Sequence, residues 1–117
     1  MKSDQQIIEK EWILESMLDV PSPDKVFPRG MPSFQYQAAD SNLNGFSGCN
    51  QFFGKADFNR NVFTPHPHWA MTKMYCPDTE EEAFLRLFQS ANAYKFKKDK
   101  LYILRDKELY LVFVPKK

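Results

Sequence analysis

The sequence predicts a mainly β protein: one antiparallel barrel or strongly curled sheet of about seven to nine short strands, with one α-helix near residues 79–91. Three observations predict this class. Aromatic residues make up 15% of the 117 residues and eleven of them are Phe, which suits half-buried strands. Short segments alternate between apolar and polar residues, with turns between them. So many strands in so short a chain would expose sheet edges unless the sheet closes on itself.

The N-terminal quarter divides into three parts. Residues 1–6 are polar and are expected to form a flexible tether, so that a single domain occupies residues 7–117. A bulky and β-branched cluster predicts a strand over residues 12–17. Residues 20–32 contain four prolines, which remove backbone donors and fix φ, and they are predicted to form a surface loop.

The middle of the chain predicts short strands joined by sharp bends. Residues 34–38 alternate with the period of a strand that buries one face. Residues 43–58 hold three of the four glycines, and we expect two strands that meet at a kink near residues 48–50. Residues 62–64 predict another strand, and residues 69–75 fit either a strand or an irregular extended segment.

Helical signals follow the second cysteine. Thr79 with Glu82, or Asp78 with Glu81, fits a capping box. An apolar face recurs at helical spacing after them, formed by Phe84, Leu87, Phe88 and Ala91. The rest of the chain predicts an antiparallel meander of three strands, with Leu109, Leu111 and Phe113 on one face.

Charge and hydropathy exclude several classes of function. Sixteen Lys and Arg against fifteen Asp and Glu give a net charge of +1, and the two signs are interspersed. Such a chain has no broad positive electrostatic field that would attract nucleic acid or an anionic membrane, so we expect neither partner. No apolar run approaches the roughly 18 residues of a membrane-spanning helix, so we expect no such segment.

The two cysteines and two histidines are the candidates for chemistry. Cys49 and Cys76 are 27 positions apart, which leaves open a disulfide, two separate buried thiols, or a thiol nucleophile with His66 or His68 as base. The two histidines lack a third ligand at a characteristic spacing, so exposed loop residues are favoured over a metal site. We expect no cofactor and no catalytic residue.

Two sequence blocks resemble the META domain family, which includes the bacterial heat-shock-associated HslJ proteins. The first is GFSGCNQFFG at residues 45–54, and the second is AMTKMYC at residues 70–76. An acidic helix and a final meander follow in the family's order. The resemblance implies a single barrel-like domain with one helix, and it spans about residues 12–114. The long proline-rich segment is a departure from the simplest members.

The resemblance also implies roles for individual residues. It makes Cys49 and Cys76 the matched pair, bridged in an oxidising envelope compartment. It gives Gly45, Gly48, Asn50 and Gly54 backbone-shaping roles and assigns Thr72 and Met74 to the second block. Any membrane tethering would go through a lipid anchor upstream of Met1.

The function that we expect is a non-catalytic cell-envelope module, a monomer that acts in protein interaction or stress tolerance, with an envelope protein as its partner. Family members carry no established catalytic residues, so the resemblance adds none. The first alternative is a barrel that carries a small hydrophobic ligand in an internal cavity. The second is a thiol- or metal-dependent enzyme, which needs a free cysteine near a histidine.

Overall fold

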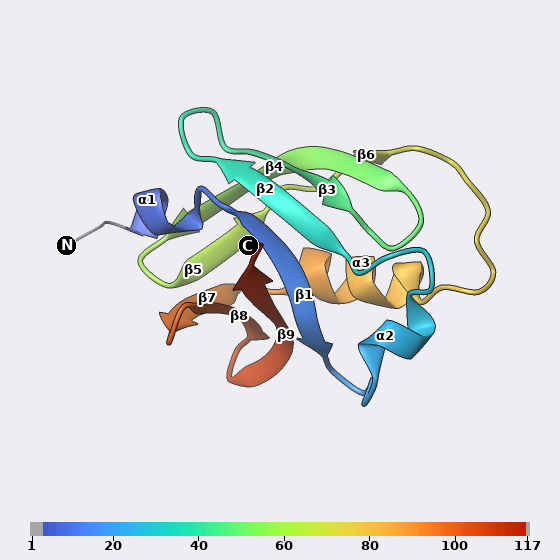
Figure 1. Cartoon of the computed structure of the whole chain (residues 1–117). Helices are drawn as coiled ribbons and strands as arrows, with labels where there is room; N and C mark the ends of the chain where they lie inside the picture. The colour runs from blue at the N-terminus through green and yellow to red at the C-terminus, as the bar shows by residue number, and fades with distance from the viewer. Residues whose placement is uncertain (1–3, 117) are drawn as a thin grey trace.

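The computed structural model describes residues 4–116 and contains one nine-stranded antiparallel sheet. The strand order is β3-β2-β1-β9-β8-β7-β5-β4-β6, and an additional pairing of β3 with β4 closes all strands except β6 into a barrel. Figure 1 shows β1 and β9 side by side at the front of this barrel. The predicted class, a curled or closed antiparallel sheet of about seven to nine strands, is confirmed.

The elements follow the predicted order closely. The strands are β1 (Glu11–Met17), β2 (Ser33–Gln37), β3 (Asn42–Phe46), β4 (Gln51–Asn59), β5 (Val62–Pro65), β6 (Ala70–Met71), β7 (Ala93–Lys97), β8 (Lys100–Arg105) and β9 (Glu108–Pro115). The helices are α1 (Asp4–Ile8), α2 (Pro23–Val26) and α3 (Glu81–Ser90). None of these described helices is both long enough and apolar enough to cross a membrane.

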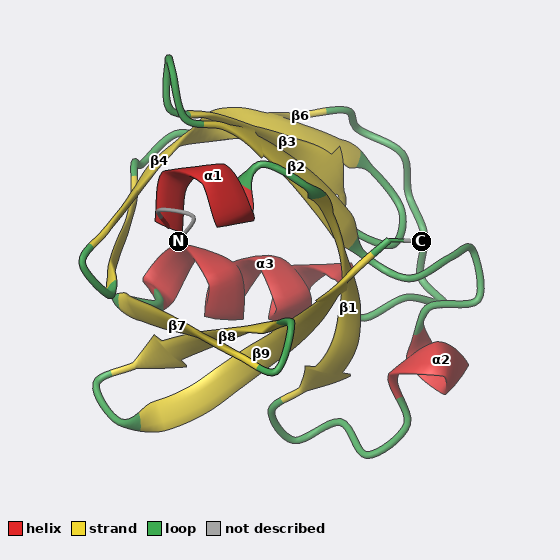
Figure 2. Cartoon of the chain, turned by 60° about the vertical axis from the view of Figure 1, so that its left-hand side comes forward, coloured by secondary structure: helices red, strands yellow, loops and turns green. Residues whose placement is uncertain are grey.

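The interior of the barrel is filled by aromatic rings, many of them around α3. In Figure 2, α3 is seen across the ring of strands, and α1 lies at the end of the barrel that faces the viewer, which is the left-hand end in Figure 1. Phe88 of α3 is fully buried, and its ring centroid lies 5.3 Å from that of Phe34, 5.4 Å from that of Phe63 and 5.5 Å from that of Phe113. Because these rings come from three different strands, α3 joins opposite walls of the barrel.

Residues 4–6 correct the prediction of a tether over residues 1–6. They belong to α1, whereas residues 1–3 lie outside the described part of the chain. The helix is held by Ile8, which is fully buried and whose carbonyl accepts a 2.9 Å hydrogen bond from Trp12 Nε1. The Tyr94 hydroxyl donates to Asp4 Oδ2 at 2.8 Å. Burial, with the Asp4 hydrogen bond second, raises the pKa of Tyr94 to about 12.

Two finer predictions are wrong. The helix α3 begins at Glu81 with Glu80 as N-cap and without a side-chain capping bond, so the predicted capping box does not form. Thr79 Oγ1 donates to the Cys76 carbonyl instead, at 3.1 Å. Leu109 is 41% exposed although Leu111 and Phe113 are fully buried, so it does not share their core position. A register shift in the β8–β9 pairing, between Ile103 and Leu104, separates Leu109 from that pattern.

A disulfide-anchored loop as the candidate functional site

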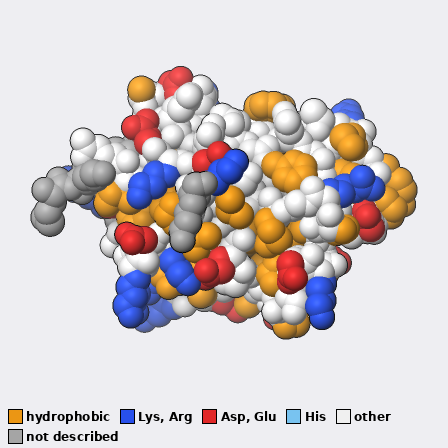
Figure 3. All heavy atoms as spheres, viewed as in Figure 1, with side chains coloured by type: hydrophobic (Ala, Val, Ile, Leu, Met, Phe, Trp, Pro, Cys, Tyr) orange, Lys and Arg blue, Asp and Glu red, His pale blue; other side chains and the backbone are white. Residues whose placement is uncertain are grey.

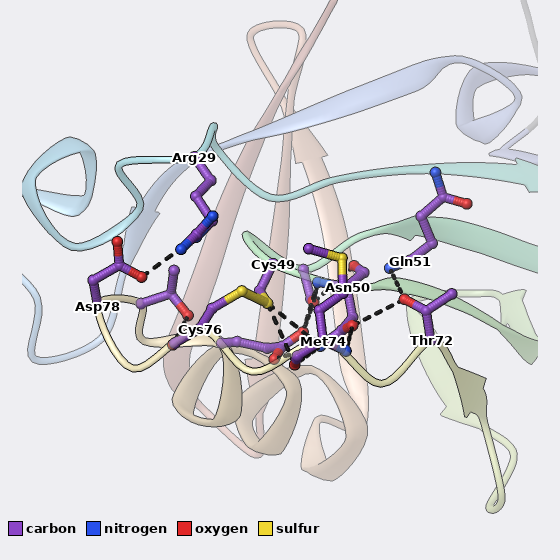
Figure 4. The surroundings of a disulfide bond; sticks show 11 residues. Arg29, Cys49, Asn50, Gln51, Thr72, Met74, Cys76 and Asp78 are labelled. Atoms are coloured by element: carbon purple, nitrogen blue, oxygen red, sulfur yellow. Dashed lines mark hydrogen bonds and ion pairs between the residues drawn. A yellow bond between two sulfur atoms is a disulfide. The ribbon is translucent and has the colours of Figure 1, made fainter.

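The kink between β3 and β4 is joined covalently to the segment before α3. Cys49 and Cys76 form a disulfide with their Cα atoms 6.0 Å apart, so neither of these described residues carries a free thiol (Figure 4). Cys49 is 5% exposed, and the chain runs from β6 through residues 72–76, called here the anchored loop, to the second cysteine. The bond therefore fixes one end of a long surface segment to the barrel wall.

Gly48 shapes the kink by leaving room for the proline-rich segment. Its φ is +100°, and a Cβ there would lie 2.4 Å from Cδ1 of Phe27. Phe27 comes directly after α2 and is 2% exposed. A side chain at position 48 would be strained and would also displace this ring. The proline-rich segment thus contributes a buried residue beneath the disulfide region.

Asn50 connects the kink to the anchored loop. Its side chain is almost fully buried, at 3% exposure. Oδ1 accepts hydrogen bonds from Met74 N at 2.6 Å and from Thr72 Oγ1 at 2.9 Å, and Nδ2 donates to the Met74 carbonyl at 3.1 Å. The amide group therefore holds both backbone groups of Met74 at once, a pairing that needs a donor and an acceptor on one planar group.

Glu81, the first residue of α3, completes this network. Its carboxylate accepts from the backbone N–H of Asn50 at 2.9 Å and from Asn50 Nδ2 at 3.0 Å. It also accepts from the hydroxyl of Ser47, a polar residue with no exposed surface. Hydrogen bonds to an ionised acceptor are about twice as strong as neutral ones. The carboxylate that the sequence suggested as a helix cap is thus used to hold the kink.

Besides the two cysteines, the family resemblance singled out six residues, and the structure brings four of them together. Gly48, Asn50, Thr72 and Met74 lie at the anchored loop, whereas Gly45 and Gly54 lie on β3 and β4. A Cβ on Gly45 would meet the Ser33 carbonyl oxygen, and one on Gly54 would meet the indole of Trp69. These two glycines allow close packing within the barrel. Sequence reasoning missed Ser47, Glu81 and Phe27, because their roles depend on contacts between distant segments.

The anchored loop presents apolar side chains to solvent. Met74 is 58% exposed and Tyr75 is 88% exposed. Beside them lies an open hollow of about 300 Å³, whose rim includes Glu80 and Glu82. Exposed large apolar residues that stand next to each other are more informative than single ones. The backbone below them is held by the disulfide and by Asn50.

His66 is paired with a carboxylate and not with a cysteine. Its Nε2 lies 2.8 Å from Asp57 Oδ2, and Ser41 Oγ donates to Asp57 Oδ1 at 2.8 Å. These hydrogen bonds, that of His66 first, hold the pKa of Asp57 below its ordinary value. Ser41 contacts the carboxylate and not the imidazole, so this is not the order of a Ser–His–Asp relay. Within the described residues, no cluster of three or more His, Cys, Asp or Glu is arranged to hold a metal ion.

Comparisons with known proteins agree on the architecture. One NMR structure of a protein has a TM-score of 0.70 and 19% identity, covering 98% of this chain and 96% of its own. An NMR structure from Burkholderia xenovorans has a TM-score of 0.69 and 18% identity, over 96% and 85% of the two chains. A crystal structure of a DUF4847 family protein from Bacteroides vulgatus has a TM-score of 0.65 and 13% identity, over 95% of each.

At these identities the three structures show a shared fold and nothing more. No curated protein matches the chain significantly. The model of the META domain family, however, matches residues 5–117, which is almost the whole chain, and the two motif blocks form the anchored loop and its attachment. The chain belongs to the META domain family.

Proposed function

We propose that this META domain is a non-catalytic protein-interaction module of an oxidising compartment in the cell envelope. The observation that carries the proposal is the exposure of Met74 and Tyr75 on a loop whose backbone is fixed from both sides. The role in stress tolerance that the family resemblance implies would follow from this binding.

Fixing the loop in the free protein favours association. A flexible loop loses conformational entropy when a partner orders it, and this loss is subtracted from the binding free energy. Here the Met74 backbone is already held by Asn50, and Cys76 is already bonded to Cys49. Apolar and aromatic anchors on such a surface are the residue types that dominate binding energy at protein interfaces.

Two features favour binding over catalysis. A cysteine nucleophile acts as a thiolate, and both cysteines are used in the disulfide. His66 is paired with Asp57, so its Nε2 is not directed at a sulfur atom. A hydrophobic carrier is disfavoured for a different reason. A ligand inside the barrel would have to displace rings such as Phe84 and Phe88, which are fully buried.

Site-specific photo-crosslinking in host cells tests the interaction. A benzophenone amino acid would replace Tyr75, with Leu109 replaced in the same way as the control, because Leu109 is also an exposed apolar residue. We expect a discrete adduct of higher mass from position 75 and none of that mass from position 109. Absence of an adduct at position 75, or the same adducts from both positions, would contradict the proposal.

The compartment has a separate test. Thiols in intact cells would be trapped by rapid acid quenching and alkylation, and the mass of the protein would report how many thiols reacted. We expect no alkylation until the sample is reduced, because an oxidising compartment preserves the disulfide. Two alkylated cysteines without reduction would place the chain in a reducing compartment and remove this part of the proposal.

A further inference from the structure

The outward face of β2, β3 and the first part of β4 has an unusual composition. Residues Ser33–Gln37, Asn42–Phe46 and 51–53 contain no charged residue at all. The meander strands β7 and β8 are different, since they carry Lys95, Lys97 and Arg105 at exposed positions. Figure 3 shows hydrophobic side chains at the centre and right of one face of the molecule, with Lys, Arg, Asp and Glu side chains around and between them.

The outward side chains on these strands are amides and phenyl rings in register. Gln35 pairs with Asn44, and Asn44 pairs with Phe53, so the three form one row across three strands. At the usual strand spacing of about 4.8 Å, this row spans about 10 Å. Ser33, Phe46 and Gln51 form the next row in the same way. The face is therefore a small grid of amide groups with a ring in each row.

Phe53 stands out of this grid. Its side chain is 49% exposed, and an open hollow lies on each side of it. One hollow, of about 230 Å³, is lined by Gln35, Asn44 and Gln51 among others. The second, of about 330 Å³, extends toward Asn42 and Lys55. An exposed phenyl ring between two open hollows offers a flat apolar surface, and each hollow has an asparagine amide in its lining.

The amide groups around the ring are not used by the fold. Within the described part of the chain, the side chains of Gln35, Asn44 and Gln51 make no hydrogen bond to another protein group. Asn is also depleted in strands, where β-branched residues pack better. Departures from local preference that bring no gain in packing tend to mark functional positions.

We propose that this face binds a neutral oligosaccharide, with one sugar ring stacked on Phe53. A carboxamide donates and accepts hydrogen bonds at the same time, which matches the hydroxyl groups of a sugar. The C–H face of a pyranose is apolar and suits the exposed phenyl ring. The absence of charge at the centre of the grid favours a neutral ligand, since Glu11 and Lys55 lie only at its margins.

Other ligand classes fit the same face less well. A nucleic acid would need cationic side chains along the phosphate backbone. A purely apolar ligand would cover Gln35 and Asn44 and leave their amide groups without partners. The site uses residues other than Met74 and Tyr75, so it goes beyond the proposed protein interaction.

An NMR titration of the folded domain tests the assignment. The probes are four neutral tetrasaccharides, those of glucose, mannose, galactose and N-acetylglucosamine. We expect at least one to cause saturable shifts in the side-chain amide signals of Gln35 and Asn44 and in the backbone signals around Phe53. No saturable shift from any of the four would overturn the proposal, as would shifts of the same residues caused by protein concentration alone, which would indicate self-association.

Two variants locate the site. Phe53→Ala should weaken binding by about fivefold to tenfold, the order expected for loss of one aromatic contact. Leu109→Ala is the matched control, because it removes another exposed apolar side chain that lies outside both proposed sites, and it should leave the affinity unchanged. Equal effects from both variants, or unchanged affinity in Phe53→Ala, would show that the sugar does not lie on this face. The outcome is independent of the crosslinking result at position 75.

Discussion

Asn50→Asp replaces the central amide of the anchored loop with a group of nearly the same shape and a different charge. In the protein, Asn50 Nδ2 lies 3.0 Å from each of the two carboxylate oxygens of Glu81 and donates to the Met74 carbonyl at 3.1 Å. At neutral pH the variant puts an oxygen in place of that donor. Two carboxylates then face each other at hydrogen-bond distance, and the Met74 carbonyl loses its donor.

The expected loss follows from these contacts. Two like charges about 3 to 4 Å apart repel by about 4 to 5.5 kcal/mol at an effective dielectric constant of about 20, and by less where solvent reaches Glu81. A lost hydrogen bond to a carbonyl contributes about 1 kcal/mol more. We therefore expect Asn50→Asp to lower the free energy of unfolding by about 4 kcal/mol at pH 7. Asn50→Ala, which removes the bonds without adding charge, should lose about 3 kcal/mol.

The pH dependence distinguishes repulsion from a loss of packing. In the Asn50→Asp variant, the two carboxyl groups at positions 50 and 81 would share one proton more readily than two separate groups, so the apparent pKa of the pair lies above the ordinary range of either. The folded variant binds that proton more tightly than the unfolded chain. The loss in free energy of unfolding of Asn50→Asp, relative to the wild type, should therefore shrink as pH falls from about 7 toward about 4. The loss of Asn50→Ala should change little over the same range.

Urea denaturation at several pH values measures these differences, and a double variant tests the pairing directly. Asn50→Asp combined with Glu81→Gln exchanges the donor and the acceptor, so it should be about 2 kcal/mol more stable than the sum of the single losses predicts. A deficit of Asn50→Asp that does not depend on pH would refute the reasoning. Additive losses in the double variant would refute it as well, because the two side chains would then not interact as described.

Three further predictions concern separate parts of the chain. Cys49→Ser should lower stability by about 3 to 4 kcal/mol in thermal unfolding under non-reducing conditions, and Cys49→Ser/Cys76→Ser should match the single variant, whereas additive losses would mean that the residues are not coupled. The buried Tyr94 phenol has a pKa raised from 10.0 to about 12, so its contribution is complete below pH 10 and decreases by about 2 to 3 kcal/mol as pH rises to 12. Tyr94→Phe should lose less stability than the wild type over that range in alkaline denaturation, and an equal loss would contradict this. Gly54→Ala would place a Cβ 2.0 Å from Cδ1 of Trp69, and we expect a loss of about 2 kcal/mol with a change in tryptophan fluorescence, while unchanged fluorescence and stability would argue against the contact.

The sequence predicted well wherever a local pattern decides the structure. Alternation over residues 34–38 predicted the strand β2, because side chains on a strand point to opposite faces. The three glycines in residues 43–58 predicted a kink between two strands, and Gly48 has the positive φ of such a bend. The apolar face at helical spacing predicted α3, whose Phe84 and Phe88 are buried.

Prediction from sequence failed where the outcome depends on a distant partner. The spacing of Glu81 suggests a capping box, but its carboxylate bonds Asn50, which is 31 residues away along the chain. Residues 4–6 are polar and suggest a tether, yet α1 is held by hydrogen bonds from Tyr94 of β7 and Trp12 of β1. No local pattern reports these contacts, because only the closed barrel brings the groups together.

The sequence by itself therefore determined the class of the fold, the order of its strands and its one long helix, and it indicated the family through two short blocks. The tertiary structure decided what those blocks do. Closure of the sheet places Asn50 between the anchored loop and Glu81, where a buried amide can satisfy a backbone and a carboxylate at once. It also aligns Gln35, Asn44 and Phe53 across three strands, since register is set by the pairing of whole strands rather than by any one segment.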